Sequence, residues 1–259
     1  MFPQIAAGEP IDFSMFGRAI AEFEFTLLFA DAPIDRFARG DHKAMNVSEK
    51  QGALIFFGKG GCISCHAVAG KSNEMFSDFE MHVIGVPQIA PQFGLGQGNV
   101  IFDGPYQNED FGLEQITGDP ADRYKFRSSP LRNVTLQPTF FHNGAFTRLE
   151  DAIYHHLHAF ESARNYDPIR AGIHEDLTVR LGPIEPVLER LDPWLLNPPL
   201  LTAEEFEDLV RFVRTGLLDK RAQADKLCSL IPTQLPSGIE PLRFTECQQP
   251  RDWTKNPTQ

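Results

Sequence analysis

The stretch CISCH at residues 62–66 decides the fold more than any other part of the chain. In a Cys-x-x-Cys-His run, both thiols add to the vinyl groups of a haem, and the adjacent histidine becomes an axial ligand of the iron. This spacing suits one helical turn, which places both sulfur atoms along one edge of the porphyrin. The motif occurs once, so it predicts one covalent haem c held by Cys62, Cys65 and His66.

Two other uses of a Cys-x-x-Cys pair fit the chain less well. A structural zinc site needs a second pair of cysteine or histidine ligands, and the remaining cysteines, Cys228 and Cys247, form no such pair. A thioredoxin-like dithiol expects a βαβ context, whereas the flanks of this motif read as helical. Haem c is usually assembled where disulfides persist, so Cys228 and Cys247 are expected to form one; the alternative is two unpaired buried thiols.

Composition and charge exclude several classes of function. The chain has 259 residues, of which 42% are hydrophobic and 23% charged, as in an ordinary globular protein. The formal net charge of -11 repels phosphate backbones, so no nucleic-acid partner is expected. No apolar run approaches the roughly 18 residues of a membrane-spanning helix. The N-terminus, MFPQIAAGEP, shows no export signal, which conflicts with the periplasmic location that a haem c indicates.

Apolar periodicity predicts a mainly helical chain with no strand set large enough for a sheet domain. Capping boxes are predicted at Ser48 with Gln51 and at Thr202 with Glu205. The segment 85–130 is rich in Gly, Pro, Asp and Asn and reads as loop. The clearest helices are expected over 12–29, from Ser48 to Phe57, over 149–160 and from Thr202 to Gly216.

The iron of a haem has a second axial position, and the helix over 149–160 offers a ligand for it. On a helical projection His156 falls in the middle of the apolar stripe, whereas His155 and His158 point away from it. A buried neutral imidazole needs a partner, which an iron atom would provide. The alternative is a core histidine bonded to a backbone carbonyl. The competing ligands close after the motif are Met75, Met81 and His82.

Beyond these patterns, the chain resembles the C-terminal half of the bacterial di-haem cytochrome c peroxidases of the MauG family. The order and spacing of four stretches carry the resemblance. They are FEFTLLFADAPIDRFARGD at 23–41, GALIFFGKGGCISCHAVAGKSNEMFSDFEMHVIGVP at 52–87, DRYKFRSSPLRNVTLQPTFFHNGAFTRLEDAIYHH at 122–156 and LTAEEFEDLVRFVRTGLLD at 201–219.

The resemblance implies roles for individual residues. The family's sixth iron ligand, Met in peroxidases and Tyr in MauG, corresponds to His156, so the position agrees and the residue type departs. Arg127 matches a family arginine near a haem propionate, and His142 matches the histidine of the His-x-Gly motif close to it. As an alternative, Arg127 and His142 are simple loop anchors. The family often binds calcium between its domains through backbone oxygens, so calcium is a further possible cofactor.

Together, the pattern and the resemblance predict an all-α fold, namely a cytochrome c-like haem domain with long loops and an extended C-terminal tail. Residues 1–45 are expected to form a helical arm that packs on the haem domain, residues 46–220 the haem domain, and residues 221–259 the tail. The family carries a first haem domain with its own motif, which this chain lacks. A fragment, a truncated gene model or a split partner is therefore expected, and the residues that break the peroxide bond would lie in the missing domain.

The resemblance also implies a function. The chain is expected to be a peroxidase-like haem c oxidoreductase that reduces hydrogen peroxide with electrons from a small cytochrome c, and to supply the electron-transfer haem. One alternative is a mono-haem electron-transfer or redox-sensing cytochrome without its own turnover. Another is a MauG-like oxidase of protein side chains, against which His156 in place of Tyr argues mildly. No catalytic residue can be named from this chain.

Overall fold

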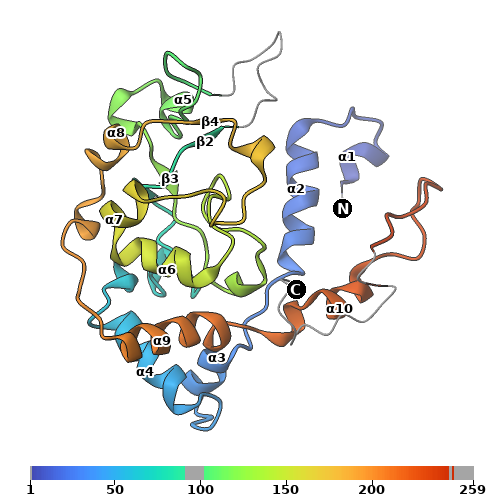
Figure 1. The fold of residues 1–259 in the computed structure, drawn as a ribbon. Coiled ribbons are helices and arrows are strands. Elements are labelled where there is room, and N and C mark those ends of the chain that lie inside the picture. Colours follow the sequence, from blue (N-terminus) through green and yellow to red (C-terminus); the bar gives the residue numbers. More distant parts are fainter. Residues whose placement is uncertain (1, 91–101, 245–246, 248–259) are drawn as a thin grey trace.

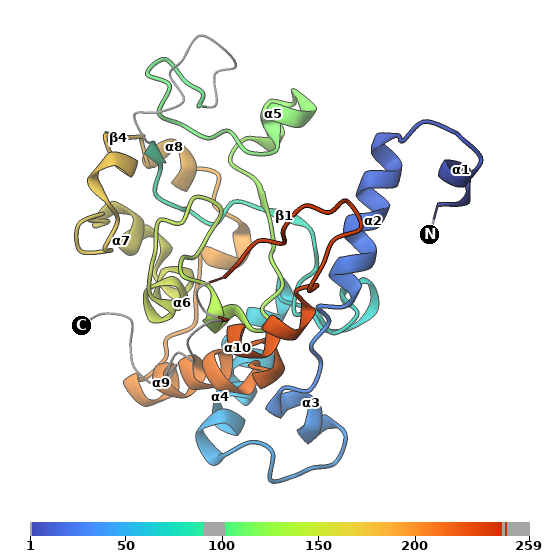
Figure 2. The same ribbon diagram turned by 90° about the vertical axis from the view of Figure 1, so that its right-hand side faces the viewer.

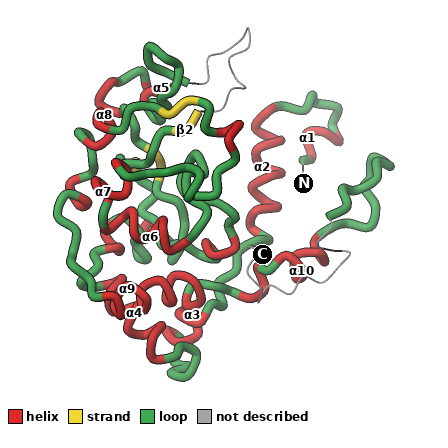
Figure 3. The backbone as a smooth tube through the Cα atoms, viewed as in Figure 1, coloured by secondary structure: helices red, strands yellow, loops and turns green. Residues whose placement is uncertain are grey.

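The computed structural model describes residues 2–90, 102–244 and 247, and Figure 1 shows their arrangement. Helices dominate, and non-helical segments connect most of them (Figure 3). The α-helices are α1 (Pro3–Ala6), α2 (Phe13–Phe25), α3 (Pro33–Ala38), α4 (Val47–Phe57), α5 (Glu114–Thr117), α6 (Leu149–Leu157), α7 (Ala159–Arg164), α8 (Glu185–Leu188), α9 (Ala203–Arg211) and α10 (Ala224–Leu227).

The strands within the described residues form two antiparallel pairs, and each strand is two residues long. β1 (Met81–His82) pairs with β3 (Phe126–Arg127), and β2 (Ile89–Ala90) pairs with β4 (Arg180–Leu181). Such short ladders fix loops in place and do not form a sheet domain. The structure is thus mainly helical with few strands, in line with a cytochrome c-like fold. Within the same residues, no helix is both long and apolar enough to cross a membrane.

The core lies where α4 crosses α9. At Gly52 the two backbones approach so closely that an added Cβ atom would lie 2.0 Å from the carbonyl oxygen of Asp208. Phe56 of α4 is 1% exposed and packs edge-on against Phe212, with ring centroids 5.4 Å apart. Phe212–Gly216 continues α9 as one π-helical turn and ends at the predicted stop. The haem motif lies next to this crossing, because it begins only five residues after α4 ends.

The two predicted capping boxes have different outcomes. The box at α9 is present, since Thr202 Oγ1 accepts from the Glu205 amide at 3.2 Å and Glu205 accepts from the Thr202 amide at 2.8 Å. At α4 the prediction of Ser48 is wrong, because the cap is Asn46 with Glu49. Ser48 instead lies inside the first turn, and its hydroxyl bonds the Asp208 carboxylate of α9.

The N-terminal arm and the tail lie on the same side of the molecule, as Figures 1 and 2 show. α2 ends at Phe25, earlier than the predicted 29, and its N-cap is Asp12. Phe13, Phe16 and Phe23 are 87%, 59% and 53% exposed, so the expected apolar face of α2 is open. The division into arm, haem domain and tail stays a prediction, and residues 245–246 and 248–259 of the tail lie outside the described part.

The cysteines of the tail are joined in the structure. Cys228 and Cys247 form a disulfide with their Cα atoms 5.5 Å apart. The bond ties the end of α10 to residue 247 and so closes the last described part of the tail into a loop.

Candidate haem-binding site

The motif follows α4 through a tight glycine-rich turn. Gly61 has a φ of +67°, a backbone conformation that glycine adopts without strain, and the chain then forms a short 3-10 turn over Cys62–Ser64. The His66 amide donates to the Cys62 carbonyl at 2.9 Å, which closes the motif into one compact turn. Cys62 and Cys65 are free, half-buried thiols, as an attachment site for a haem requires.

The hydrogen bond of its Nδ1 atom orients His66 and leaves its Nε2 atom available as a ligand. That atom lies 3.1 Å from the carbonyl oxygen of Phe76, so it carries the proton and leaves the lone pair on Nε2. Burial, followed by the nearby imidazole of His156, lowers the pKa of His66 to about 4. The ring is therefore neutral at pH 7, which is the form that binds iron.

His156, on α6, also has its Nδ1 atom bonded to a backbone carbonyl. Its Nδ1 atom lies 2.8 Å from the Ala152 carbonyl one turn earlier, so its Nε2 atom also keeps a lone pair. Burial lowers the pKa of His156 as well. The ring centroids of His66 and His156 are 6.2 Å apart.

This spacing fits one metal ion between the two rings. Taking a metal–nitrogen bond of about 2.0 Å, two imidazoles on opposite sides of one ion would have centroids roughly 6 Å apart. The centroid distance between His66 and His156 is therefore compatible with an ion between the two rings. Phe56 lies beside His66 and Phe141 beside His156, with centroids 6.5 and 5.5 Å away, so the surroundings are apolar.

The helical projection of α6 was wrong about His155. This side chain is 0% exposed, with Nε2 2.8 Å from the Ile84 carbonyl and Nδ1 3.0 Å from the Ser162 hydroxyl. Burial lowers its pKa to about 3. The physical reason is that α6 is covered on more than one side, because Phe141 and Phe146 pack on the His155 ring. His155 and His156 are thus both bonded to a backbone carbonyl, but His155 has both ring nitrogens engaged, whereas His156 has only Nδ1 engaged.

The competing ligands are placed differently. Both ring nitrogens of His82 are engaged by carboxylates, Nδ1 by Asp192 at 2.7 Å and Nε2 by Asp78 at 2.9 Å. Burial alone would lower the pKa of His82, but these two hydrogen bonds raise it above its ordinary value. Met81 is exposed on β1 and Met75 is half-buried after the motif. Because both of its ring nitrogens are engaged by carboxylates, His82 is a poor iron ligand.

One cluster next to the motif has the composition of a metal site. The ligand atoms of Cys65, Asp78 and His82 lie within 4.8 Å of one another. A thioether bond to haem would use the Cys65 sulfur, and the two carboxylates already use both nitrogens of His82. The cluster therefore serves better to fix the loop after the motif than to bind a second metal.

Arg127 and His142, the residues implied by the resemblance, lie on the β1–β3 side. Arg127 is exposed, with its guanidinium 5.6 Å from the centroid of the Phe79 ring. His142 stacks on Phe126 at 3.4 Å, and burial lowers its pKa to about 4. In the part of the chain that the structure describes, neither stacks on or hydrogen-bonds to His66 or His156. Their haem contacts stay predictions.

The sequence reasoning missed the groups that orient the two imidazoles. The Phe76 carbonyl belongs to the backbone, and Phe76 has a φ of +58°, which no periodicity signals. Phe141, which covers both His155 and His156, also has a positive φ, at +66°.

Comparison with known proteins finds relatives among the bacterial cytochrome c peroxidases. Cytochrome c551 peroxidase of Pseudomonas aeruginosa is 32% identical over 152 residues, which cover 59% of this chain and 38% of that protein. Methylamine utilization protein MauG of Methylorubrum extorquens is 32% identical over 149 residues, covering 58% and 36%. This chain is similar to bacterial cytochrome c peroxidases and MauG. It spans less than two fifths of the length of these two relatives.

A solved structure extends the likeness to most of the fold. A MauG-like protein associated with microbial copper homeostasis superposes with a TM-score of 0.53 and 25% sequence identity. The match covers 84% of this chain and 61% of that one. No protein-family model matches the chain.

Proposed function

We propose that this chain is the electron-transfer part of a peroxidase-type haem c oxidoreductase. Cys62 and Cys65 would hold the haem covalently, and His66 and His156 would bind its iron from opposite sides. The observation that carries the proposal is the pair of neutral imidazoles with centroids 6.2 Å apart, directly beside a Cys-x-x-Cys-His motif. Relatives named cytochrome c peroxidases support the reaction class.

The residues of the site favour electron transfer over peroxide binding. When bound, a haem c supplies reversible one-electron transfer. The Phe76 and Ala152 carbonyls hold His66 and His156 with their Nε2 atoms free, so both axial positions would be filled by protein. Hydrogen peroxide would find no open position here, and its cleavage would take place on a second haem.

The second haem would come from another domain or chain, and α2 offers a surface for it. The side chains of Phe13, Phe16 and Phe23 form an exposed apolar face, and such faces mark interaction sites. A small cytochrome c would donate the electrons, and its basic surface would suit the -11 charge of this chain. The disulfide favours the periplasm as the location. Calcium at the junction of two domains belongs to the same proposal.

A mono-haem electron-transfer cytochrome is the second candidate. The single motif in the given sequence and the two imidazoles that would bind the iron favour it, because both would suit a chain that passes electrons without turnover of its own. Addition of hydrogen peroxide and reduced cytochrome c to the purified holoprotein distinguishes the two. Peroxide-dependent oxidation of the donor, alone or after addition of a second haem domain, supports the peroxidase; its absence in both supports the electron-transfer module.

The ligand assignment has a direct spectroscopic test. Produced with haem maturation machinery, the chain should gain the mass of one haem and give a low-spin ferric signal in electron paramagnetic resonance. The His156→Ala variant should become high-spin, because one axial ligand is lost. His158→Ala changes a histidine on the same helix end that contacts Tyr154 and serves as the matched control. A high-spin wild type, or an unchanged His156→Ala signal, would contradict the assignment.

A further inference from the structure

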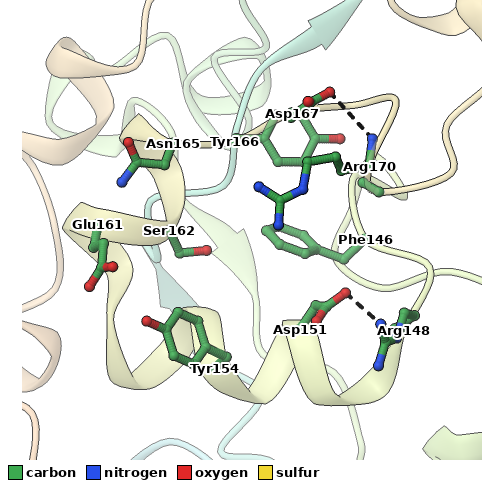
Figure 4. Close-up of a pocket in the computed structure, with 11 residues that line it drawn as sticks. Phe146, Arg148, Asp151, Tyr154, Glu161, Ser162, Asn165, Tyr166, Asp167 and Arg170 are labelled. Atoms are coloured by element: carbon green, nitrogen blue, oxygen red, sulfur yellow. Dashed lines mark hydrogen bonds and ion pairs between the residues drawn. The ribbon is translucent and has the colours of Figure 1, made fainter.

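A surface cleft opens on the outer side of the helix that carries His156. It has a volume of about 470 Å³ and lies between α6, α7 and the loop that follows α7. Figure 4 shows Phe146 and Tyr166 on one side of it, Tyr154 on another, and Ser162 and Asn165 along α7. This volume is in the range of small-molecule sites.

Aromatic rings connect the cleft to the proposed iron ligand. Tyr166 and Phe146, which line the cleft, have centroids 5.5 Å apart. Phe146 lies 5.1 Å from Phe141, and Phe141 lies 5.5 Å from His156. Each step joins rings whose centroids are no more than 5.5 Å apart, so a series of neighbouring aromatic rings leads from the cleft to His156.

The cleft also has a polar contact, which leads to the buried His155 and not to His156. His155 donates from Nε2 to the Ile84 carbonyl, so its Nδ1 atom accepts from the Ser162 hydroxyl at 3.0 Å. Ser162 lines the cleft, and its oxygen keeps lone pairs for a ligand donor (Figure 4). The Tyr166 hydroxyl is already committed, since it donates to the Ala145 carbonyl at 2.7 Å. Tyr166 therefore presents its ring rather than its hydroxyl.

The charges of the lining favour a neutral ligand. Arg148 and Asp151 lie 3.8 Å apart as a pair, and the other charged groups of the cleft are also of both signs. Such a lining gives no strong field for a cation or an anion. It offers hydrogen-bond donors and acceptors next to an aromatic wall, which suits a flat ring that carries a hydroxyl group.

We propose that this cleft binds a small neutral phenol and that the series Tyr166, Phe146 and Phe141 passes its electron toward His156. The proposal rests on the peroxidase-type function above. Each phenol loses one electron and its hydroxyl proton and becomes a phenoxyl radical. In turnovers in which phenols replace the cytochrome as donor, two phenols supply the two electrons and two protons that hydrogen peroxide takes up when its O–O bond breaks, which gives two water molecules. The protons leave through the carboxylates at the rim of the cleft and the solvent.

Calorimetric titration with 4-methoxyphenol tests the binding. Asn165 is exposed at the rim, so Asn165→Trp fills the cleft without changing the core. We expect saturable binding to the wild type that weakens at least tenfold in Asn165→Trp, and weaker binding of 1,4-dimethoxybenzene, which has no hydroxyl donor. Asn197→Trp, at an exposed position outside the cleft, is the matched control and should bind like the wild type. Absence of saturable binding, or equal binding in both variants, overturns the proposal.

Flash photolysis tests the electron route without peroxide. A laser flash that converts bound 4-methoxyphenol to its radical should oxidise the ferrous haem, followed by its absorbance. We expect at least a tenfold slower rate in Phe146→Leu, and the same in Tyr166→Leu, which keeps the test valid if Phe146→Leu does not fold. Phe37→Leu on α3 is the control and should leave the rate unchanged. An unchanged rate in a folded Phe146→Leu or Tyr166→Leu protein overturns the route.

The two proposals fail separately. The titration is carried out on both the haem-free and the haem-loaded chain, so binding is measured whether or not haem is incorporated. A chain that gains no haem mass but binds the phenol contradicts the proposed function and leaves the cleft site standing. A haem-loaded, low-spin chain that binds no phenol contradicts the cleft site alone.

Discussion

α4 and α2 are both short helices rich in phenylalanine, yet they differ in what covers them. Phe56 of α4 is 1% exposed beneath α9, whereas Phe16 of α2 is 59% exposed. Gly52 of α4 lies against the α9 backbone, while Gly17 of α2 has no atom within 4 Å of where a Cβ would stand. Apolar side chains alone therefore do not create a core; a second surface must approach closely enough to exclude water.

The difference also separates two kinds of function. The covered region holds the motif and the His66–His156 pair, whose lowered pKa values depend on burial. The open face of α2 contributes nothing to that site and is available to another domain. A packed region and a docking region can thus share one composition.

The largest expected effect comes from removing the two phenylalanines in turn. Phe56→Ala should destabilise the protein by about 3 to 5 kcal/mol, since it leaves a cavity under α9. Phe16→Ala should change the free energy of unfolding by no more than about 0.5 kcal/mol, because its side chain is largely in water already. Denaturant unfolding followed by circular dichroism measures both. A large loss in Phe16→Ala would show that α2 is covered in the isolated chain.

Replacing the two glycines by alanine should change the free energy of unfolding by smaller amounts and with opposite signs. Gly52→Ala should cost about 3 kcal/mol, because the new methyl group would overlap the Asp208 carbonyl and force α4 and α9 apart. Gly17→Ala should stabilise α2 by up to about 1 kcal/mol, because alanine has the higher helix propensity and meets no neighbour. Thermal unfolding of both variants measures the pair. Equal shifts in both would remove the proposed difference in packing.

The smallest expected effect is the pH dependence of the free energy of unfolding that two histidines of the covered region produce. The pKa of His82 is raised in the folded chain, so its pairing with Asp78 and Asp192 stabilises fully below pH 6.5, the ordinary value. That contribution is lost as the pH rises through the folded pKa. His155 acts oppositely: its pKa is lowered to about 3, so it destabilises the fold as the pH falls below 6.5.

Unfolding free energies at several pH values separate these two histidines. The wild type should lose unfolding free energy as the pH rises toward 8. This loss should be smaller in His82→Asn. His174→Asn is the control, because His174 pairs with Asp176 on the exposed surface. A His82→Asn profile parallel to that of the wild type would contradict the raised pKa.

Much of this protein could be predicted from its sequence, for physical reasons that are local. The motif at 62–66 specifies its chemistry by spacing alone, and the box at Thr202 and Glu205 needs no distant contact. The prediction that His156 is an iron ligand rests on one helical stripe and stays a prediction. Each of these depends on neighbours within a turn or two, and such contacts are written in the order of residues.

The tertiary structure decided what distant segments do to one another. It gave Ser48 a partner in Asp208, 160 residues away, whereas the actual cap of α4, Asn46 with Glu49, is a local box. It buried His155 by placing Phe141 and Phe146 on a side of α6 that the stripe leaves polar. It also left the apolar face of α2 open. Burial depends on which surfaces meet, and no periodicity within one helix contains that information.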